Sequence, residues 1–233
     1  MKTTLVVNPK GGSGKTTIAV NLASALAIQN LPVTLMDYDP QGSSLGWLRS
    51  RAPHAPSIHG ANGAPERFGR LRSFEMYVPP QTRHLVIDAP AGAGGLLLQQ
   101  MLDRAHEVLV PVVPSVIDIR ASEAFIRDLL AMPKVRYGEA RVGIVANKVR
   151  ISMPAYQPLL RFLESVEVKL VARLLDSDLY VRAAENGVGI FEMDPGQAAA
   201  ERRQFTPIID WLRGAEGPVD AQREVRQIRR VGL

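Results

Sequence analysis

Two lysines five residues apart lie in one glycine-rich segment, and they are the residues of this sequence best suited to chemistry. Residues 8–17 read Asn-Pro-Lys-Gly-Gly-Ser-Gly-Lys-Thr-Thr. The end of the segment, Gly14, Lys15 and Thr16, matches a phosphate-binding loop of the form G-x-x-x-x-G-K-[ST], although a proline replaces the first glycine of that motif. Lys10 is an additional cation that the motif lacks, so it requires a role of its own.

The residues around this loop predict the elements that position it. Residues 2–7 form a β-branched, apolar run typical of a buried parallel strand. Residues 15–29 are expected to form a helix whose positive N-terminal end points at bound phosphates. An alternative is a glycine-rich turn with incidental lysines, but the order of strand, loop and helix favours a nucleotide site.

The loop side chains can be given separate roles toward a nucleoside triphosphate. Lys15 is expected to bridge the β- and γ-phosphates, Thr16 to bind Mg²⁺ through its hydroxyl, and Thr17 to contact the α-phosphate. Glycines let backbone N–H groups approach phosphate oxygens without a Cβ in the way. The predicted nucleotide-binding residues of the loop are Lys10, Gly11, Gly12, Ser13, Gly14, Lys15, Thr16 and Thr17.

Aspartates follow two further predicted strands, at residues 32–36 and 84–88. Ligands of open parallel sheets bind beyond the carboxyl ends of the strands, so Asp37, Asp39 and Asp88 are expected beside the loop. Asp88 would hold Mg²⁺, commonly through a water, or alternatively cap a helix.

Asp39 would orient the attacking water, or alternatively form a turn before Pro40. Asp37 is expected to support the metal shell or the loop. The predicted metal-binding residues are therefore Thr16, Asp39 and Asp88, and the four histidines show no ligand spacing.

The alternation of strand and helix patterns predicts a single-domain α/β fold, with a doubly wound, mostly parallel sheet covered by helices on both faces. Residues 1–214 are expected to form this domain and residues 215–233 a basic C-terminal extension. Residues 51–66 lack periodicity and are predicted to be a long, mobile surface loop. Further strands are expected at 107–113, 141–146 and 169–174, and further helices at 43–49, 96–104, 122–131, 155–165, 197–213 and 220–231.

Composition excludes several classes of protein. The chain of 233 residues has no cysteine, which excludes disulfides, thiolate catalysis and iron–sulfur ligation by thiolates. The predicted strand begins too early to leave room for a signal peptide, and no apolar run approaches roughly 18 residues. We therefore expect a soluble, cytoplasmic protein. Its formal net charge of +5 is compatible with a polyanionic partner.

With these motifs in place, the chain resembles the ParA branch of the ParA/MinD ATPases, which carry a deviant Walker A box. The matching segments cover about two thirds of the chain in the family's order, and the C-terminal third matches loosely. The Asp-x-Asp-Pro-Gln segment favours ParA over MinD-like members. The matching segments are 8–17, 37–42, 87–90 and 147–148.

The resemblance implies that Lys10 reaches across a nucleotide-sandwich homodimer to the phosphates held by the partner. ATP with Mg²⁺ would close the dimer, and hydrolysis supported by Lys10, Lys15 and Asp39 would release it. Asn147 would contact adenine, and Asp176 with Ser177 would border it. Family members coat nucleoid DNA nonspecifically, and a ParB-like or cargo-adaptor protein stimulates hydrolysis. Their cargoes are plasmids, chromosome regions, and protein assemblies such as carboxysomes or chemoreceptor clusters.

Nonspecific binding to double-stranded DNA requires basic side chains directed at phosphates. Our preferred candidates are Arg182, Arg202 and Arg203, each of which could instead be a solvated surface charge. The wider basic set adds Lys148, Arg150, Lys169 and Arg173.

The terminal segment 222–231 could be a DNA-contacting tail, a packed helix or a membrane-surface helix, although its apolar residues are few for a membrane contact. Two other functions remain as alternatives: a MinD-like membrane-associated regulator and a soluble metabolic ATP-dependent ligase. The nitrogenase iron-protein class is excluded because it requires cysteine ligands.

Overall fold

A parallel sheet of seven strands organises the protein, which is described here from a computed structural model covering residues 1–64, 75–150, 152, 154 and 156–214. The strand order is β3-β2-β4-β1-β5-β6-β7, and neighbouring strands pair in parallel. The strands are β1 (Lys2–Val6), β2 (Val33–Asp37), β3 (Ile58–Asn62), β4 (His84–Asp88), β5 (Glu107–Val112), β6 (Arg141–Val149) and β7 (Lys169–Leu175).

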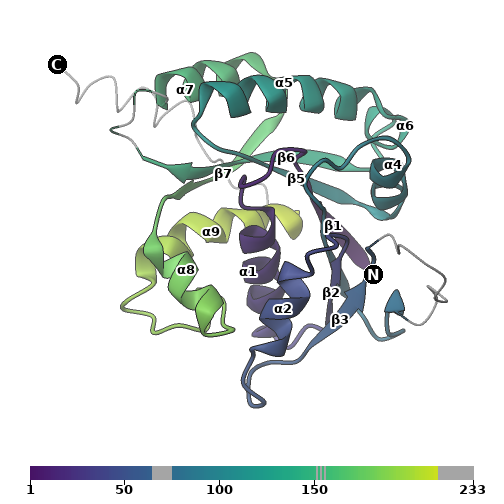
Figure 1. Cartoon of the computed structure of the whole chain (residues 1–233), viewed down its shortest axis with the longest axis vertical. Coiled ribbons are helices and arrows are strands. Elements are labelled where there is room, and N and C mark those ends of the chain that lie inside the picture. The colour runs from purple at the N-terminus through teal and green to yellow at the C-terminus, as the bar shows by residue number, and fades with distance from the viewer. Residues whose placement is uncertain (65–74, 151, 153, 155, 215–233) are drawn as a thin grey trace.

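Helices cover both faces of this sheet (Figure 1). On one face lie α4 (Gly95–Arg104), α5 (Val116–Ala131), α6 (Pro133–Arg136) and α7 (Tyr156–Ser165). On the other lie α1 (Lys15–Ala27), α2 (Ser43–Arg49), α8 (Asp178–Glu185) and α9 (Ala199–Leu212). The predicted doubly wound α/β fold is confirmed.

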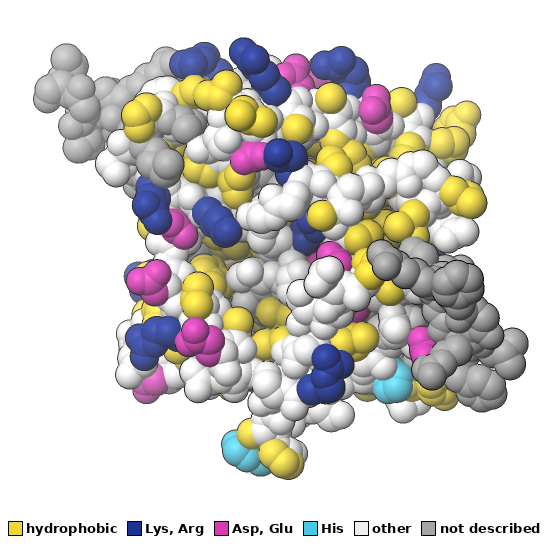
Figure 2. All heavy atoms as spheres, viewed as in Figure 1, with side chains coloured by type: hydrophobic (Ala, Val, Ile, Leu, Met, Phe, Trp, Pro, Cys, Tyr) yellow, Lys and Arg dark blue, Asp and Glu magenta, His cyan; other side chains and the backbone are white. Residues whose placement is uncertain are grey.

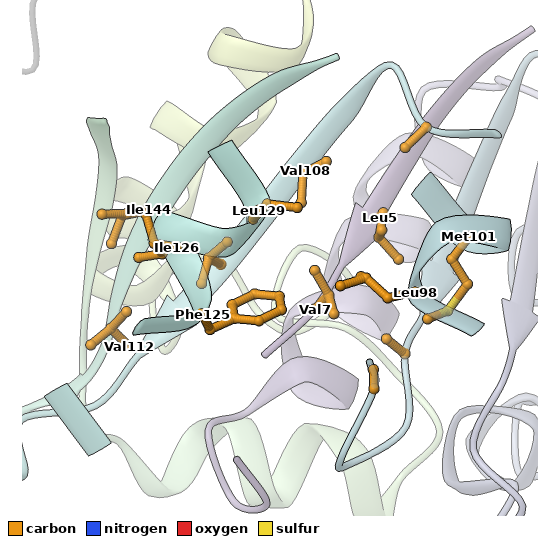
Figure 3. Close-up of a cluster of buried hydrophobic side chains, with 14 of the residues drawn as sticks. Leu5, Val7, Leu98, Met101, Val108, Val112, Phe125, Ile126, Leu129 and Ile144 are labelled. Carbon is orange, nitrogen blue, oxygen red and sulfur yellow. The ribbon is translucent and has the colours of Figure 1, made fainter. Parts of the chain in front are cut away.

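Alternation of side chains along the central strand divides the core into two layers. Leu5 and Val7 pack in one hydrophobic cluster with Met101 of α4 and Phe125 of α5 (Figure 3). Val6 belongs to the second cluster, which includes residues of α1 and α9. A strand that is buried on both faces reads as a continuous apolar run, which explains why the sequence predicted it so clearly.

The strand register brings the carboxyl ends of the central strands to one level. Val6 lies opposite Asp88, and Asp88 lies opposite Asp37. We call the edge formed by the carboxyl ends of β1, β2, β4, β6 and β7 the carboxyl rim. The loop after β1 and the acidic residues after β2 and β4 therefore meet at this rim, as open parallel sheets require.

The prediction of a mobile loop over residues 51–66 is wrong for residues 51–64, and residues 65–66 lie outside the described part of the chain. Residues 58–62 form edge strand β3, which pairs with β2 along its whole length. The Arg51 guanidinium is buried, donates to the Pro56 carbonyl and forms an ion pair with Glu192 at 2.7 Å. The sequence of this strand, Ile-His-Gly-Ala-Asn, has few apolar residues and no regular alternation, because most of its side chains are only partly buried. The strand was therefore difficult to predict from sequence.

Other element boundaries differ less from the predictions. Helix α5 begins six residues before the expected position 122, and β6 extends three residues beyond 146. Helices α6 and α8 were not predicted. The predicted helix at 220–231 and the extension 215–233 lie outside the described residues. Within the described part of the chain, no helix is long and apolar enough to cross a membrane.

A buried histidine on β4 predicts a pH dependence of stability. The His84 ring lies 3.2 Å from the Thr4 hydroxyl, and burial, with smaller contributions from Lys2 and His106, lowers its pKa from 6.5 to about 4. The unfolded chain therefore binds a proton more readily, so the free energy of unfolding should fall as the pH drops from 6.5 toward 4, by at most roughly 3 kcal/mol from this residue.

Urea unfolding measured across this pH range checks the prediction. His84→Gln, which cannot take up the proton, should flatten the pH dependence, whereas the same substitution at exposed His54 should leave it unchanged. An unaltered slope in the His84→Gln protein would contradict the assignment.

Candidate nucleotide site

The glycine-rich loop has the backbone geometry of an anion cradle. Gly12 and Gly14 have φ of +77° and +90°, in the left-handed region that favours glycine, and Gly14 caps the N-terminus of α1. A Cβ on Gly14 would lie 2.1 Å from Asn147 Nδ2, so the position has no room for a side chain. The loop therefore lies at the positive N-terminal end of α1, a position suited to binding a phosphate.

The end of β6 holds the loop from the side. The Asn147 side chain is buried and its Nδ2 donates to the Ser13 carbonyl at 2.8 Å. Lys148 has a φ of +52°, and its Nζ donates to the Gly12 carbonyl at 3.1 Å. These contacts supply donors to two carbonyl oxygens of the loop. Those oxygens therefore do not need the backbone N–H groups of the loop, which can bind an anion instead.

Lys15 lies inside the loop, as the motif predicts. Its side chain is buried, and Nζ donates to the Lys10 carbonyl at 3.1 Å. Burial lowers its pKa, and the charges of Asp88 and Asp39 oppose that shift. The predicted loop residues and carboxylates are thus brought together around one ammonium group.

Asp88 carries a buried carboxylate that the Thr16 and Ser44 hydroxyls approach without forming hydrogen bonds of normal geometry. Both oxygens are buried, and neither accepts a hydrogen bond of normal geometry from the described residues. Burial raises its pKa to about 7 and the charge of Asp37 adds to the shift, whereas the Thr16 hydroxyl, the charge of Lys15 and the Ser44 hydroxyl oppose it. An unsatisfied carboxylate is costly, so this site is suited to a ligand that satisfies it.

A hydrated Mg²⁺ fits this arrangement. Thr16 and Asp88 would hold it, with Asp39 nearby, and the ion would neutralise negative charge on the transferring phosphoryl group. Among the described residues, no group of three His, Asp or Glu side chains is placed to hold a metal. The metal would therefore depend on phosphate oxygens and water, as Mg²⁺ commonly does.

Asp37 has a structural role in this arrangement. It is fully buried, and its carboxylate accepts hydrogen bonds from the backbone N–H groups of Asp39 (2.9 Å), Ser44 (3.0 Å) and Leu45 (3.2 Å). The last two are at the start of α2, so Asp37 caps that helix. These contacts lie within residues 39–45 and not in the glycine-rich loop, so support of the metal shell or of that loop by Asp37 stays a prediction.

Asp39 lies in a turn at the mouth of the site. Its Oδ1 accepts a hydrogen bond from Gln41 N at 2.9 Å, and its carbonyl accepts from Gly42 N at 2.8 Å. The turn-forming alternative is therefore correct as a description of the local structure. The charge of Asp39 also opposes the lowering of the Lys15 pKa by burial. The role of Asp39 in hydrolysis stays a prediction.

A pocket of about 320 Å³ opens beside the loop. It brings together Thr17, Asn147 and Asp176, which were predicted to bind the nucleotide. Asp176 accepts a hydrogen bond from Arg150 Nε at 2.6 Å, so its charge is balanced at the pocket mouth. The remaining lining residues are Lys148, Leu175, Ser177, Tyr180, Val181 and Ala184.

Sequence reasoning missed the wall of this pocket formed by α8. Ser177 caps that helix by accepting from Leu179 N, and the Ser177 hydroxyl donates to Glu201 on α9 at 2.8 Å. The signal was present, because Asp-Ser-Asp before a short amphipathic run is typical of a helix start. Tyr180 was not predicted as a pocket residue.

The three preferred DNA candidates have different environments. Arg182 on α8 and Arg203 on α9 are exposed. The Arg202 guanidinium instead donates to the carbonyls of Ile190 (3.1 Å) and Phe191 (2.9 Å), and also to that of Met193. Arg202 is therefore committed to holding the segment before α9, and its prediction as a DNA contact is corrected.

Comparison with known proteins agrees with this geometry. The fold and the loop define a nucleotide-binding domain of the P-loop class. The family model described as the CobQ/CobB/MinD/ParA nucleotide binding domain matches residues 4–190, and the chain belongs to that family. The expectation of a ParA/MinD-type ATPase is confirmed at this level, as is the use of ATP with Mg²⁺ in the family.

Individual relatives include proteins named for carboxysome distribution and for chromosome partitioning. The chain is 25% identical over 205 residues to the "Maintenance of carboxysome distribution protein A" of Halothiobacillus neapolitanus, covering 85% of the chain and 91% of that relative. It is 51% identical over 114 residues to the chromosome-partitioning ATPase Soj of Thermus thermophilus, covering 47% and 45%.

Solved structures share the fold. The cell division protein MinD of Aquifex aeolicus superposes with a TM-score of 0.69 at 18% identity, covering 94% of this chain and 99% of that one. A complex of Cyanothece McdA with ATP gives a TM-score of 0.66 at 17% identity, covering 94% and 98%.

The environments of Asp88 and Asp37 predict opposite effects of the same substitution. Asp88→Asn removes an unsatisfied buried charge, so it should raise the melting temperature without nucleotide while reducing the stabilisation by ATP and Mg²⁺. Asp37→Asn removes the charged acceptor at the start of α2, so it should lower the melting temperature by an amount corresponding to about 1–2 kcal/mol.

Thermal unfolding of both variants, with and without ATP and Mg²⁺, provides the measurement. Equal destabilisation by the two substitutions would show that the buried Asp88 charge is satisfied in the unliganded protein.

Proposed function

We propose that this chain is an ATPase that dimerises with ATP, binds nonspecific nucleoid DNA and positions or segregates a cargo, with hydrolysis stimulated by a partner protein. The observation that carries the proposal is the placement of the two lysines. Lys15 is buried and directed into its own loop, whereas the Lys10 side chain is 41% exposed and directed away from it. A single subunit thus has one lysine positioned for its own triphosphate.

The surface around Lys10 suits a second copy of the chain. Gly92 N donates to the Pro9 carbonyl at 2.8 Å, which places the turn before α4 against the loop. Leu96 on α4 is 70% exposed, and Ile117 on α5 is 72% exposed. Exposed apolar side chains near a partly exposed lysine are what a dimer closed over two triphosphates would bury.

The chemistry follows from the roles of the named residues. Lys15 stabilises negative charge on the β- and γ-phosphates from within its subunit, and Lys10 of the other subunit adds a second cation as charge develops. Asp39 at the mouth orients the attacking water, and Asp88 with Thr16 holds the metal shell. Separation of Lys10 from the partner's phosphates after hydrolysis weakens the dimer.

Two contacts connect the nucleotide pocket with the helices proposed to bind DNA. Glu201 on α9 accepts from the Ser177 hydroxyl, and Gln204 on α9 accepts from Leu175 N at 2.8 Å. Arg203 lies between these two residues in sequence, and Arg182 lies on the helix that Ser177 caps. In the view of Figure 2, basic and acidic side chains are interspersed, so phosphate binding is expected to require pairing of these arginines in the dimer.

Lys10→Ala should abolish the ATP-dependent dimer while leaving ATP binding to one subunit largely intact, because Lys15 and the loop backbone remain. Light scattering measures the dimer, and equilibrium binding of a fluorescent ATP analogue measures the single site. An ATP-dependent dimer of unchanged affinity in the variant would refute the trans role of Lys10.

DNA affinity should rise with ATP and fall steeply with salt. The comparison uses nonspecific duplex DNA with ATP, ADP or no nucleotide at two salt concentrations. Arg182→Gln combined with Arg203→Gln should weaken binding and reduce the salt dependence, by a slope of roughly one per lost phosphate contact. Arg136→Gln combined with Arg161→Gln, two exposed residues on α6 and α7 across the sheet, is the matched control.

Equal, weak DNA binding in all three nucleotide states would contradict the positioning function. In that case binding to anionic vesicles would favour a MinD-like membrane regulator, and turnover of a small-molecule acid with ATP would favour a metabolic ligase.

A further inference from the structure

Hydrogen bonds hold the backbone of Lys10 in place on both sides of its Cα atom. Lys10 N donates to Asn8 Oδ1 at 2.9 Å. Its carbonyl accepts from Lys15 Nζ at 3.1 Å and from the Ser13 hydroxyl at 3.2 Å. With both backbone groups held, any change in the position of the Lys10 ammonium must come from rotation of its own side chain.

Asn8 connects this backbone to helix α5. Its side chain is 1% exposed, and Nδ2 donates to the Pro111 carbonyl at 2.7 Å and to the Ser122 hydroxyl of α5 at 3.0 Å. The Asn8 side-chain amide thus uses its nitrogen to bond β5 and α5, and its oxygen to bond the backbone of Lys10. These bonds hold the backbone of Lys10 close to α5.

The first turn of α5 supplies the partner of the Lys10 ammonium. Lys10 Nζ lies 3.5 Å from Asp118 Oδ1, and the Asp118 side chain is 22% exposed. The N-terminus of α5 stabilises the Asp118 carboxylate independently of the lysine, so that charge tolerates departure of Lys10. A partly exposed ion pair of this kind is weak enough to exchange.

We propose that Asp118 is a positioning residue that holds Lys10 against its own subunit until the triphosphate of a second subunit competes for it. This inference rests on the proposed ATP-dependent dimer. When the dimer closes, the Lys10–Asp118 ion pair must break in each of the two subunits. The pair therefore opposes dimerisation and raises the protein concentration that is needed for ATP to produce a dimer. The partner that displaces Asp118 is a polyphosphate anion.

Neutralising Asp118 should therefore favour the dimer. With saturating ATP and Mg²⁺, Asp118→Asn should lower the protein concentration at half-dimerisation by between about twofold and thirtyfold, because two weak ion pairs no longer oppose closure. Asp118→Glu should restore a value near that of the unchanged protein. Glu123→Gln removes the same charge from α5 at a residue that pairs with Arg127, and should leave the concentration unchanged.

A second readout tests the ion pair in the single subunit. Without nucleotide, an amine-reactive reagent followed by peptide mass spectrometry should modify Lys10 faster in Asp118→Asn than in the unchanged protein. Exposed Lys169 on β7 serves as the internal standard. Faster labelling with an unchanged dimerisation concentration would overturn the proposed control of dimerisation, and unchanged labelling would overturn the ion pair itself.

The two proposals fail in distinguishable ways. If the unchanged protein forms no dimer with ATP while Lys10 labelling still responds to Asp118→Asn, the proposed dimer is wrong and with it the control of dimerisation. If the unchanged protein dimerises with ATP and Asp118→Asn behaves as Glu123→Gln, only the role of Asp118 is wrong.

Discussion

The constraint on which the site depends is the burial of the Asp88 carboxylate at the carboxyl rim. The register of β1, β4 and β2 places Asp88 beside Asp37, in a position where water does not reach it. Asp37 satisfies its own charge by capping α2, whereas Asp88 accepts no hydrogen bond of normal geometry from the described residues, although the Thr16 and Ser44 hydroxyls lie near it. The unliganded protein therefore retains an electrostatic cost that a metal and a nucleotide remove.

Around this carboxylate, the chain separates two lysines that are close in sequence. Lys15 is drawn inward by its contact with the Lys10 carbonyl and by the charges of Asp88 and Asp39. The Lys10 side chain instead lies partly exposed, beside Asp118. One loop thereby presents one cation to its own ligand and another to a neighbouring molecule.

Much of the phosphate side of the site could be predicted from sequence, because its signals are local. Gly14 is needed both for its left-handed backbone and for the close approach of Asn147, and a glycine in a motif predicts such a position directly. Asp88 was found because an acidic residue ended a continuous apolar strand. The roles of Asp37 could not be separated, because they depend on N–H groups seven and eight residues away that only the fold brings near.

The errors arose where tertiary contacts decide the structure. Strand β3 has a weak pattern and is stabilised by its pairing with β2 and by the buried Arg51–Glu192 ion pair, whose members are far apart in sequence. Arg202 was read as an available surface charge, but its guanidinium is used by three backbone carbonyls. Charge alone does not distinguish a basic residue that binds a partner from one that holds a loop.

The central claim is that Lys10 acts on a triphosphate held by another subunit. Its most direct test is a crystal structure of the Asp39→Ala protein with ATP and Mg²⁺, since that substitution is expected to slow hydrolysis. The account predicts a dimer in which Lys10 Nζ has left Asp118 and lies within ion-pair distance of the partner's phosphates. A structure in which Lys10 remains on Asp118, or contacts only the ATP of its own subunit, would contradict it.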